Sequence, residues 1–416
     1  MSTNLKIALR FLLFKRRAML MTLSGIIFGV AFFILTQAQT SGFEQFFIQT
    51  ILGTDGAIRI ADREQETVAS RTVSAEGGAK VDPLVLEMQR KYIEGIDYPS
   101  TLKATLAAFS EITGVAEVVR GSVKLESSRK TQDAQAFGIN LAEFRRVSNL
   151  EGQIIAGSLG TFEKSPQGII VGSELAVKAS VKCGDVVTLT SGSTSQRFTV
   201  SAIFETGVGD IDKVRVIVHL GSVRSLLGRP FGASYLQVST KDPDFAPELS
   251  ARLARLLRHY ASPWQKREKV WLEVFRALRF SSAITVSTII LVSALGMFNT
   301  LAMLVIEKTR EIAILRSYGF SKRDVTSIFL WLGFVVIVAG SSLGCATGAL
   351  LTMAAENIPL RIRGIFSTDH FIVNWDPNHY LAAVLTAVIV VSVAAIFPAR
   401  RAARIEPGEI IRGASS

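Results

Sequence analysis

The chain has 416 residues, 49% of them hydrophobic, and a formal net charge of +11. Its length allows two or three domains, and its mean hydropathy of +0.35 is rarely seen in a soluble protein of this size. The two cysteines, Cys183 and Cys345, exclude a disulfide framework or a cysteine-based zinc site, and they are expected in different compartments.

The basic residues gather beside long apolar runs. In an arrangement with four membrane spans, every end that carries them faces the cytoplasm, which is the positive-inside pattern. This placement favours a membrane protein over a nucleic-acid-binding one. The residues concerned are Lys6, Arg10, Lys15, Arg16, Arg17, Lys308, Arg310, Arg316, Lys322, Arg323, Arg400, Arg401, Arg404 and Arg412.

Residues 1–17 contain a basic amphipathic sequence, LKIALRFLLFKRR, which predicts a helix along the inner membrane surface. The uncharged run 18–43 follows, and it is longer than the about 20 apolar residues that cross a bilayer. A cleaved signal peptide is the alternative, but the run is too long for its apolar core and has no A-x-A cleavage site near its end. We therefore predict an uncleaved first span, in which Gly25 and Gly29 allow close helix contact.

Residues 44–277 are interpreted as one external domain. Their strand-like segments alternate or run apolar, contain β-branched residues and are bounded by glycine. Strands are predicted at 116–125, 134–139, 168–171, 185–189, 198–204, 213–218 and 235–239. Helices are predicted between them, at 102–110, 173–179, 222–227 and 247–260. This interleaving predicts an α+β fold with a mixed sheet, while the polar region 62–100 is interpreted as mobile or inserted.

A charged, aromatic helix over 264–280 is predicted to run straight into the second span, 280–306. Trp264, Trp271 and Phe275 are expected near the outer membrane interface, as an aromatic belt. Asn299 places one amide at depth in this span. An interhelical hydrogen bond is its expected role, with a cargo contact as the alternative.

The third span, 326–355, contains GSSLGCATG, which matches the G-x-S-x-G pattern of hydrolase nucleophiles. That pattern requires a strand–turn–helix context, whereas this segment lies in the middle of an apolar helix. We therefore interpret Gly340, Gly344 and Gly348 as one small-residue stripe for helix packing. The fourth span is predicted at 380–399.

The segment EKTREIAILRSYGFSKRDV, residues 307–325, separates the second span from the third. Gly319 predicts the end of one helix, and Ser321 with Asp324 predicts the capping box of the next. Two interpretations stay open at this point. The segment is either a basic connector that orients the protein, or a docking helix whose apolar ridge enters a groove on a cytoplasmic partner. The ridge would consist of Ile312, Ala313, Ile314, Leu315 and Tyr318.

This segment resembles the coupling-helix motif of the FtsX-like, macrolide-exporter and lipoprotein-releasing permeases, which are membrane subunits of ABC transporters. The resemblance implies that it docks on a separate ATPase. The matching residues are Glu307, Lys308, Thr309, Arg310, Glu311, Ile312, Ile314, Leu315, Arg316 and Gly319. The segments GFEQFFIQTILG and FPARRAARIEPGE also resemble this family, and the first favours its lipoprotein-releasing branch.

The resemblance implies a membrane protein with four transmembrane α-helices and a large α+β extracytoplasmic domain between helices 1 and 2. Its expected parts are residues 1–43, 44–277 and 278–416, the last ending in a cytoplasmic tail, 400–416. The implied location is the cell inner membrane, crossed several times, with both termini in the cytoplasm and the large domain in the periplasm.

The chain contains no P-loop sequence G-x-x-x-x-G-K-[ST], so ATP and Mg²⁺ are expected on a separate ATPase chain. This chain is expected to be no enzyme and to hold no metal or cofactor of its own. The implied partners are an ABC ATPase dimer, a second permease copy or a paralogue, membrane lipids, lipoprotein cargo and a periplasmic carrier or adaptor, but no nucleic acid. A cargo cavity between the first two spans is predicted at Ile26, Phe33, Met297 and Met303.

In the lipoprotein-releasing pair, one permease carries a long hook between adjacent external strands, and this hook docks the carrier. Here only SGSTSQR joins the strands at 187–190 and 198–204. The chain is therefore expected to be the partner-type permease or to serve a different cargo. Two alternatives stay open: an efflux or peptide-export permease of the macrolide-exporter type, and a non-transporting signal transmitter to a cell-wall hydrolase.

Overall fold

The structure, a computed structural model, describes residues 7–8, 10–11, 16–65, 91–93, 95–359 and 370–404. The chain divides into a helical unit, residues 1–45, 273–360 and 369–416, and a sheet unit, residues 46–272 and 361–368. Predictions for most of the amphipathic start, for much of the polar region and for the tail beyond Arg404 lie outside the described residues.

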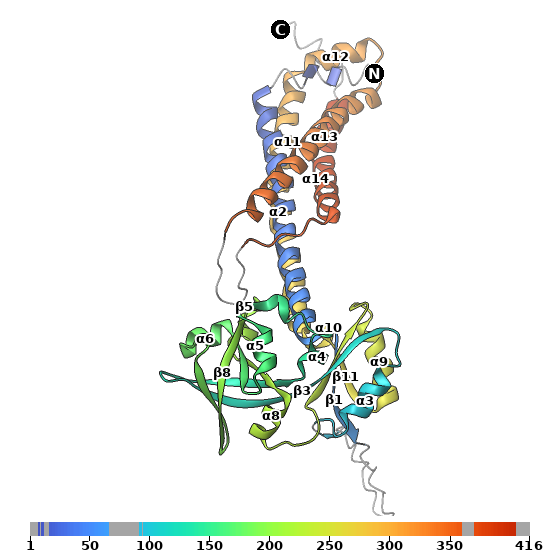
Figure 1. The fold of residues 1–416 in the computed structure, drawn as a ribbon. Coiled ribbons are helices and arrows are strands. Elements are labelled where there is room, and N and C mark those ends of the chain that lie inside the picture. The colour runs from blue at the N-terminus through green and yellow to red at the C-terminus, as the bar shows by residue number, and fades with distance from the viewer. Residues whose placement is uncertain are drawn as a thin grey trace, which may run out of the picture. The chain divides into compact units, whose positions relative to one another are not determined.

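The helical unit is built on four long helices, shown in blue, yellow-orange, orange and red in Figure 1. They are α2 (Arg16–Asp55), α11 (Lys269–Glu307), α13 (Lys322–Glu356) and α14 (Pro377–Ala403). Within the described ranges, these four helices are long and apolar enough to cross a membrane, as the predicted fold class requires. The short α12 (Thr309–Ser317) joins α11 to α13, and both α2 and α11 continue into the sheet unit.

The packing of α14 follows a pattern expected in lipid. Small residues at every fourth position are buried in the core of the helical unit, whereas large apolar side chains on the opposite face are exposed. Small side chains let helix backbones approach closely, and large ones suit a lipid environment. The buried set is Ala383, Ala387, Val391, Ala395 and Ala399, and the exposed set is Leu381, Leu385, Ile389, Val393 and Phe397.

The sheet unit contains one mixed sheet of eleven strands. Nine strands follow the order β11-β1-β10-β3-β4-β9-β6-β8-β5, while β2 pairs with β1 and β7 pairs with β3 and β8. The pairs β4–β9 and β6–β8 are parallel and the others are antiparallel. The strands are β1 (Ile58–Gln65), β2 (Lys91–Ile93), β3 (Ile112–Glu126), β4 (Thr131–Ile139), β5 (Ile154–Gly157), β6 (Gly168–Gly172), β7 (Val186–Ser191), β8 (Thr194–Phe204), β9 (Arg215–His219), β10 (Tyr235–Thr240) and β11 (His259–Pro263).

The described residues of this unit include two hydrophobic cores. One joins strands β3, β4 and β6 to β9 with α6 and α8, and the other joins β1 and β10 with α3, α9 and Trp264. The helices of the unit are α3 (Pro99–Leu106), α4 (Leu141–Phe144), α5 (Leu159–Lys164), α6 (Ser173–Ala179), α7 (Gly209–Asp212), α8 (Leu220–Leu227), α9 (Ala246–Leu257) and α10 (Trp264–Arg267), with a 3₁₀ turn at Glu151–Gln153.

The seven predicted strands and four predicted helices of this unit are confirmed, with boundaries that shift by a few residues. The sequence analysis missed β1, β2, β5 and β11; β2 lies in the polar region 62–100, and the residues of β11 were taken partly for the end of a helix. The placement of Trp264 at a membrane interface was wrong. Its ring is buried in the second core, where Nε1 donates a 2.9 Å hydrogen bond to the Pro243 carbonyl. A turn of two residues joins β7 to β8, so this position carries no hook.

Candidate coupling site

The helix α12 divides its apolar residues between two faces. Ile312 is buried in a cluster that also contains Phe11 and Phe329, and Ala313 beside it is fully buried, whereas Ile314 and Tyr318 are exposed at 44% and 83%. Leu315 is half-buried between the two faces. Because residues four apart lie above one another on a helix, Ile314 and Tyr318 form one ridge. The structure therefore narrows the predicted ridge to these two side chains.

Both ends of the turn after α12 are fixed by hydrogen bonds. Gly319 has a φ of +95°, a conformation that favours glycine. Phe320 N–H donates to the Leu315 carbonyl at 3.2 Å and Gly319 N–H to that of Arg316 at 3.1 Å, which is a Schellman motif. Ser321 and Asp324 then form the predicted capping box at the start of α13. The end of α12 and the beginning of α13 are thus joined by a rigid turn.

Charged side chains surround the ridge. The Lys308 ammonium forms an ion pair with Glu311 and lies 5.8 Å from the centre of the Phe11 ring, on the inner side of the helix. Thr309 Oγ1 donates to the Val305 carbonyl at 2.8 Å and so ties the start of α12 to the end of α11. Arg310 is exposed one turn before the ridge and Glu307 is exposed at the end of α11, while Arg316 is half-buried. An exposed apolar ridge with a charged rim is the composition of a protein-docking surface.

The predicted glycine stripe of α13 lies against α2. A Cβ atom at Gly340, Gly344 or Gly348 would come within 2.7–3.0 Å of Ile26, Val30 or Ile34 respectively. On α2 itself, Gly25 and Gly29 lie against Ser293 and Ile290 of α11. The glycines therefore serve close packing inside one chain. The helical backbone around Ser342 also lacks the strand–turn–helix context of a hydrolase nucleophile.

The side chains predicted for a cargo cavity divide into two groups. Ile26, Phe33 and Met297 are at most 5% exposed and belong to the core of the helical unit. These three side chains therefore pack in the core. Their predicted place in a cargo cavity is wrong, because side chains that line a cavity must be accessible. Met303 is 54% exposed, and Asn299 and Leu295 are exposed on the same face of α11.

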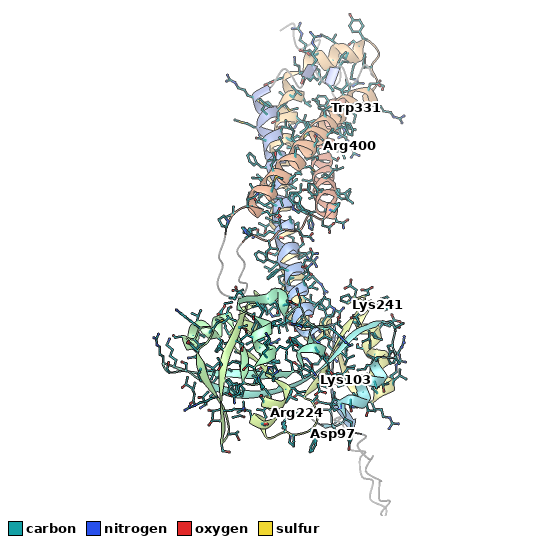
Figure 2. All side chains as sticks on the ribbon, in the orientation of Figure 1. Asp97, Lys103, Arg224, Lys241, Trp331 and Arg400 are labelled. Atoms are coloured by element: carbon teal, nitrogen blue, oxygen red, sulfur yellow. The ribbon has the colours of Figure 1, made fainter. Side chains whose placement is uncertain are left out.

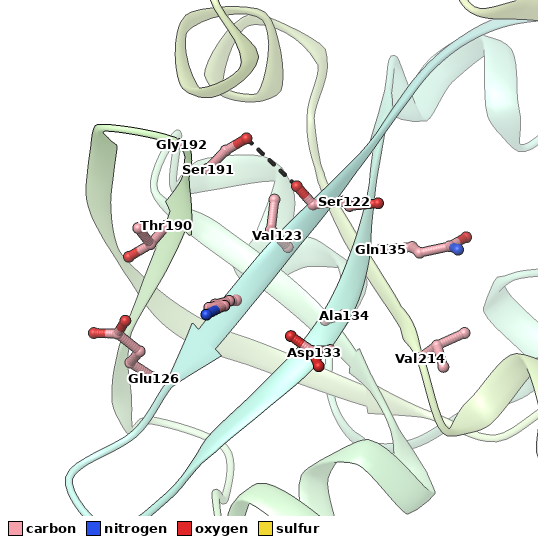
Figure 3. A pocket seen from close by; sticks show the side chains of 11 residues that line it. Ser122, Val123, Glu126, Asp133, Ala134, Gln135, Thr190, Ser191, Gly192 and Val214 are labelled. Carbon is pink, nitrogen blue, oxygen red and sulfur yellow. Dashed lines mark hydrogen bonds between the residues drawn. The ribbon is translucent and has the colours of Figure 1, made fainter.

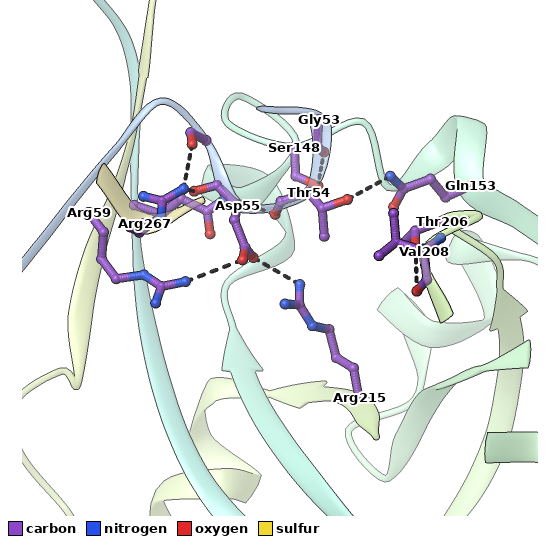
Figure 4. A network of polar contacts seen from close by, with 12 residues as sticks. Gly53, Thr54, Asp55, Arg59, Ser148, Gln153, Thr206, Val208, Arg215 and Arg267 are labelled. Atoms are coloured by element: carbon purple, nitrogen blue, oxygen red, sulfur yellow. Dashed lines mark hydrogen bonds and ion pairs between the residues drawn. The ribbon is translucent and has the colours of Figure 1, made fainter. Parts of the chain in front are cut away.

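A buried ion network that the sequence analysis missed lies where α2 ends (Figure 4). The Asp55 carboxylate receives Arg215 at 3.0 Å and Arg59 at 3.2 Å. Arg267 donates to the backbone carbonyls of Asp55 and Gly56 at 3.4 and 3.0 Å. These last residues of α2 follow the predicted first span, residues 18–43, and belong to the sheet unit, which begins at residue 46. The network, hereafter the arginine clamp, therefore joins the ends of β1, β9 and α10 to the end of α2.

The electrostatics of the arginine clamp depend on Asp55. Burial alone would raise the pKa of this carboxyl, but Arg215 and Arg59 lower it to about 2. Burial and the nearby Arg59 lower the pKa of Arg267. Arg215 also lies over the Phe137 ring, 4.3 Å from its centre. Two guanidinium groups therefore share one carboxylate, with the third, Arg267, close by on the backbone, beside a cavity of about 390 Å³.

Elsewhere in the sheet unit, polar groups serve packing and surface roles. Glu117 is 7% exposed and pairs with Lys103 at 3.2 Å and Arg224 at 3.0 Å, two residues marked in Figure 2. A second cavity, of about 700 Å³, is lined mainly by polar side chains of β3, β4 and β7 (Figure 3). Across the described ranges, no group of three or more histidine, cysteine or acidic side chains is arranged to hold a metal ion.

Comparisons with known proteins identify the two main parts of the chain. The sequence matches two family models, described as the MacB-like periplasmic core domain over residues 19–256 and the FtsX-like permease C-terminal over residues 283–407. It is 27% identical over 440 aligned positions to the lipoprotein-releasing system transmembrane protein LolC of Xylella fastidiosa, covering 98% of each chain. It is 24% identical over 413 positions to LolE of Haemophilus influenzae, covering 93% of this chain and 92% of that protein.

Two further comparisons concern proteins named MacB. The macrolide export ATP-binding/permease protein MacB of Pasteurella multocida is 24% identical, covering 71% of this chain and 46% of that protein. The crystal structure of the periplasmic region of MacB from Actinobacillus actinomycetemcomitans is 14% identical with a TM-score of 0.34, covering 53% of this chain and 94% of that one.

Proposed function

Because this chain belongs to the FtsX-like permease family and carries a MacB-like periplasmic core domain, it is the membrane subunit of an ABC transporter, and we propose that it couples ATP hydrolysis by a separate ATPase dimer to the release of lipoproteins from the inner membrane. The exposed ridge of α12 carries the coupling part of this proposal. The likeness to LolC and LolE over nearly the whole chain supports the lipoprotein part.

The contacts around α12 suit the transfer of a push. Ile312 packs the inner face of the helix into the core of the helical unit, and Ala313 beside it is fully buried. The Schellman motif and the capping box leave little freedom in the turn that leads to α13. A displacement of the ridge Ile314–Tyr318 by a closing ATPase dimer would therefore move α13 as well. Motion would reach the periplasmic domain through α2 and α11, which are continuous helices that enter it.

A second permease is part of the proposal. Leu295, Asn299 and Met303 form an exposed stripe at four-residue spacing on α11. A side-chain amide exposed to lipid is unfavourable, and interhelical hydrogen bonds are its usual partners in membranes. Among the described residues the Asn299 side chain makes no hydrogen bond, so the interhelical bond expected for it stays a prediction. We assign the stripe to the interface with a second copy or a paralogue, next to which the acyl chains of cargo would be held.

The chemistry of ATP hydrolysis is assigned to the partner. We propose that ATP and Mg²⁺ bind only to the ATPase chains, and that this permease contributes positioning and movement. The inner membrane as location, with both termini in the cytoplasm, is part of the same proposal, because an ATPase that docks on α12 has to share the cytoplasmic side with it.

The ridge gives the first test. Ile314→Asp is expected to abolish co-purification of an ABC ATPase with the tagged permease in mild detergent, because a buried unpaired carboxylate at the centre of an interface is strongly unfavourable. The matched control, Ile314→Val, keeps the apolar ridge and should recover the ATPase as the wild type does. Mass spectrometry of the recovered proteins also identifies any second permease.

Ile314→Asp present in the membrane at wild-type amounts and still bound to the ATPase would contradict the assignment of α12 as the docking helix. If neither wild type nor control recovers an ABC ATPase, the proposed function itself fails.

A macrolide-exporter type of activity is the second candidate, and the likeness to MacB favours it. Reconstituted vesicles distinguish the two: release of a fluorescent triacylated lipoprotein supports our proposal, whereas transport of a small molecule or peptide supports efflux. A signal transmitter would do neither and would instead bind a cell-wall hydrolase. The two-residue turn between β7 and β8 supports cargo handling without direct docking of a carrier at that hairpin.

A further inference from the structure

The helix α2 carries one stripe of residues at four-residue spacing that faces a single neighbour over most of its length. Ile26, Val30 and Ile34 of this stripe lie against the three glycines of α13. The next two members, Ala38 and Gly42, continue the same face for two more turns. Both are buried. A different segment of the chain must therefore cover them.

Residues 371–374, just before α14, cover these two turns. Asn374 N–H donates to the Ala38 carbonyl at 2.9 Å. A Cβ atom at Gly42 would lie 2.8 Å from both the Ile372 carbonyl oxygen and the Val373 Cα. Both neighbours are backbone atoms, so they cannot make room by a change of rotamer. Only glycine allows this backbone approach, which gives a physical reason for the glycine at position 42.

Two side-chain contacts flank this backbone contact. Ser41 Oγ lies 2.8 Å from His379 Nε2, in the first turn of α14. The Phe43 ring meets the Phe371 ring edge-on, with 6.0 Å between centres. On the other side of α2, Gln37 donates to the Arg279 carbonyl at 3.2 Å, and Arg279 pairs with Glu44 at 3.3 Å. The outer part of α2 is thus held between α11 and residues 371–374.

We propose that residues 371–374 form a strap that makes the outer part of α2 move together with α13 and α14, and that Gly42 is the positioning residue that seats it. A push on α12 reaches α13 directly through the capped turn. The glycine stripe passes that movement to α2 along the spans. The strap adds contacts to α2 over the two turns that follow the contact with Gly348. The consequence for transport rests on the proposed function, whereas the seating of the strap does not.

The seating is tested by a disulfide. In full-length chain with Cys183→Ser and Cys345→Ser, the pair Ala38→Cys and Asn374→Cys is expected to cross-link readily in native membranes, because the backbone hydrogen bond holds the two residues in register. Adding Gly42→Ala should lower the ratio of cross-linked to free chain by about tenfold, as overpacking of this size shifts equilibria by that order. Phe371→Ala, which leaves the backbone unchanged, should lower it to a smaller extent.

The matched control is Gly53→Ala. This glycine lies in the same helix, but a Cβ there would be 3.7 Å from Asn149 Cβ, an ordinary contact. Its cross-linking should equal that of the parent. A parent pair that does not cross-link, or equal cross-linking in Gly42→Ala and Gly53→Ala, would overturn the proposed strap.

The transport arm uses proteoliposomes with the ATPase and a fluorescent triacylated lipoprotein. The cross-linked chain is expected to keep ATP-dependent release, since α2 and the strap move as one body, while Gly42→Ala loses about tenfold with ATPase binding unchanged. Loss of release on cross-linking that a reductant restores would overturn the shared movement. If the wild type releases no lipoprotein, the proposed cargo fails while the disulfide still decides the strap.

Discussion

Replacing Asp55 with asparagine is expected to destabilise the sheet unit by about 3–5 kcal/mol, the cost of removing one partner from a buried ion pair. The variant would leave Arg59, Arg215 and Arg267 together without the carboxylate that two of them share. Hydrogen–deuterium exchange of the full chain in detergent measures the effect. Exchange should rise sharply in peptides that cover the end of α2, β1 and β9, because local opening then needs less free energy.

The matched control for this variant is Asp210→Asn. Asp210 lines the same cavity but is exposed, and it forms no ion pair among the described residues. A surface carboxylate of this kind contributes little to stability. Equal exchange in the two variants would mean that the arginine clamp does not hold the end of α2 to the sheet.

The same carboxylate predicts a dependence on pH. The pKa of Asp55 is about 2 in the folded protein, against an ordinary value of 3.8. Because the folded-state value is the lower one, ionised Asp55 stabilises the folded unit above pH 3.8, and this contribution is lost as the pH falls towards 2. A shift of this size corresponds to about 2 kcal/mol. The difference in stability between wild type and Asp55→Asn should therefore be smaller at pH 3 than at pH 7.

The arginine clamp could not be predicted from local sequence patterns. Asp55 and Arg215 are 160 positions apart, and neither belongs to a motif. The one local signal is the Asp-Gly pair that ends an otherwise apolar helix, at Asp55 and Gly56. Gly56 has a φ of +62° and donates to the Leu52 carbonyl, as a helix-ending glycine does. The partners of Asp55 depend on the order of strands in the sheet, which periodicity does not reveal.

Features that depend on spacing within one helix were easier to predict from the sequence. The spacing of Gly340, Gly344 and Gly348 predicted a packing stripe, and Ser321 with Asp324 predicted a cap, because both patterns depend on neighbours within one helix. The direction in which a helix face points depends on the other helices. For this reason the sequence suggested Phe33 and Met297 for a cavity although both are buried, and it did not separate the braced Ile312 from the exposed Ile314.

Adding a side chain where α2 contacts α13 is likewise expected to destabilise the helical unit. A Cβ at Gly344 would lie 2.7 Å from Val30 Cβ and 3.2 Å from the Ile27 carbonyl oxygen, so Gly344→Ala has to push the two helices apart. Overpacking of this kind costs about 1–3 kcal/mol, and Gly344→Ile, with its larger side chain, should leave little folded chain in the membrane. Thermal unfolding of the purified full chain in mild detergent measures the first effect, and membrane abundance the second.

A compensating change makes the prediction specific. Val30→Gly removes the atoms that the new methyl group would meet, so Val30→Gly with Gly344→Ala should be more stable than the sum of the two single changes allows. The matched control, Gly296→Ala, adds a methyl group 3.7 Å from Thr22 Cγ2 and should unfold at the wild-type temperature. Additive effects of the Val30 and Gly344 variants would show that these residues do not meet. Coupled effects would place α2 and α13 in the close contact on which the transfer of movement from α12 depends.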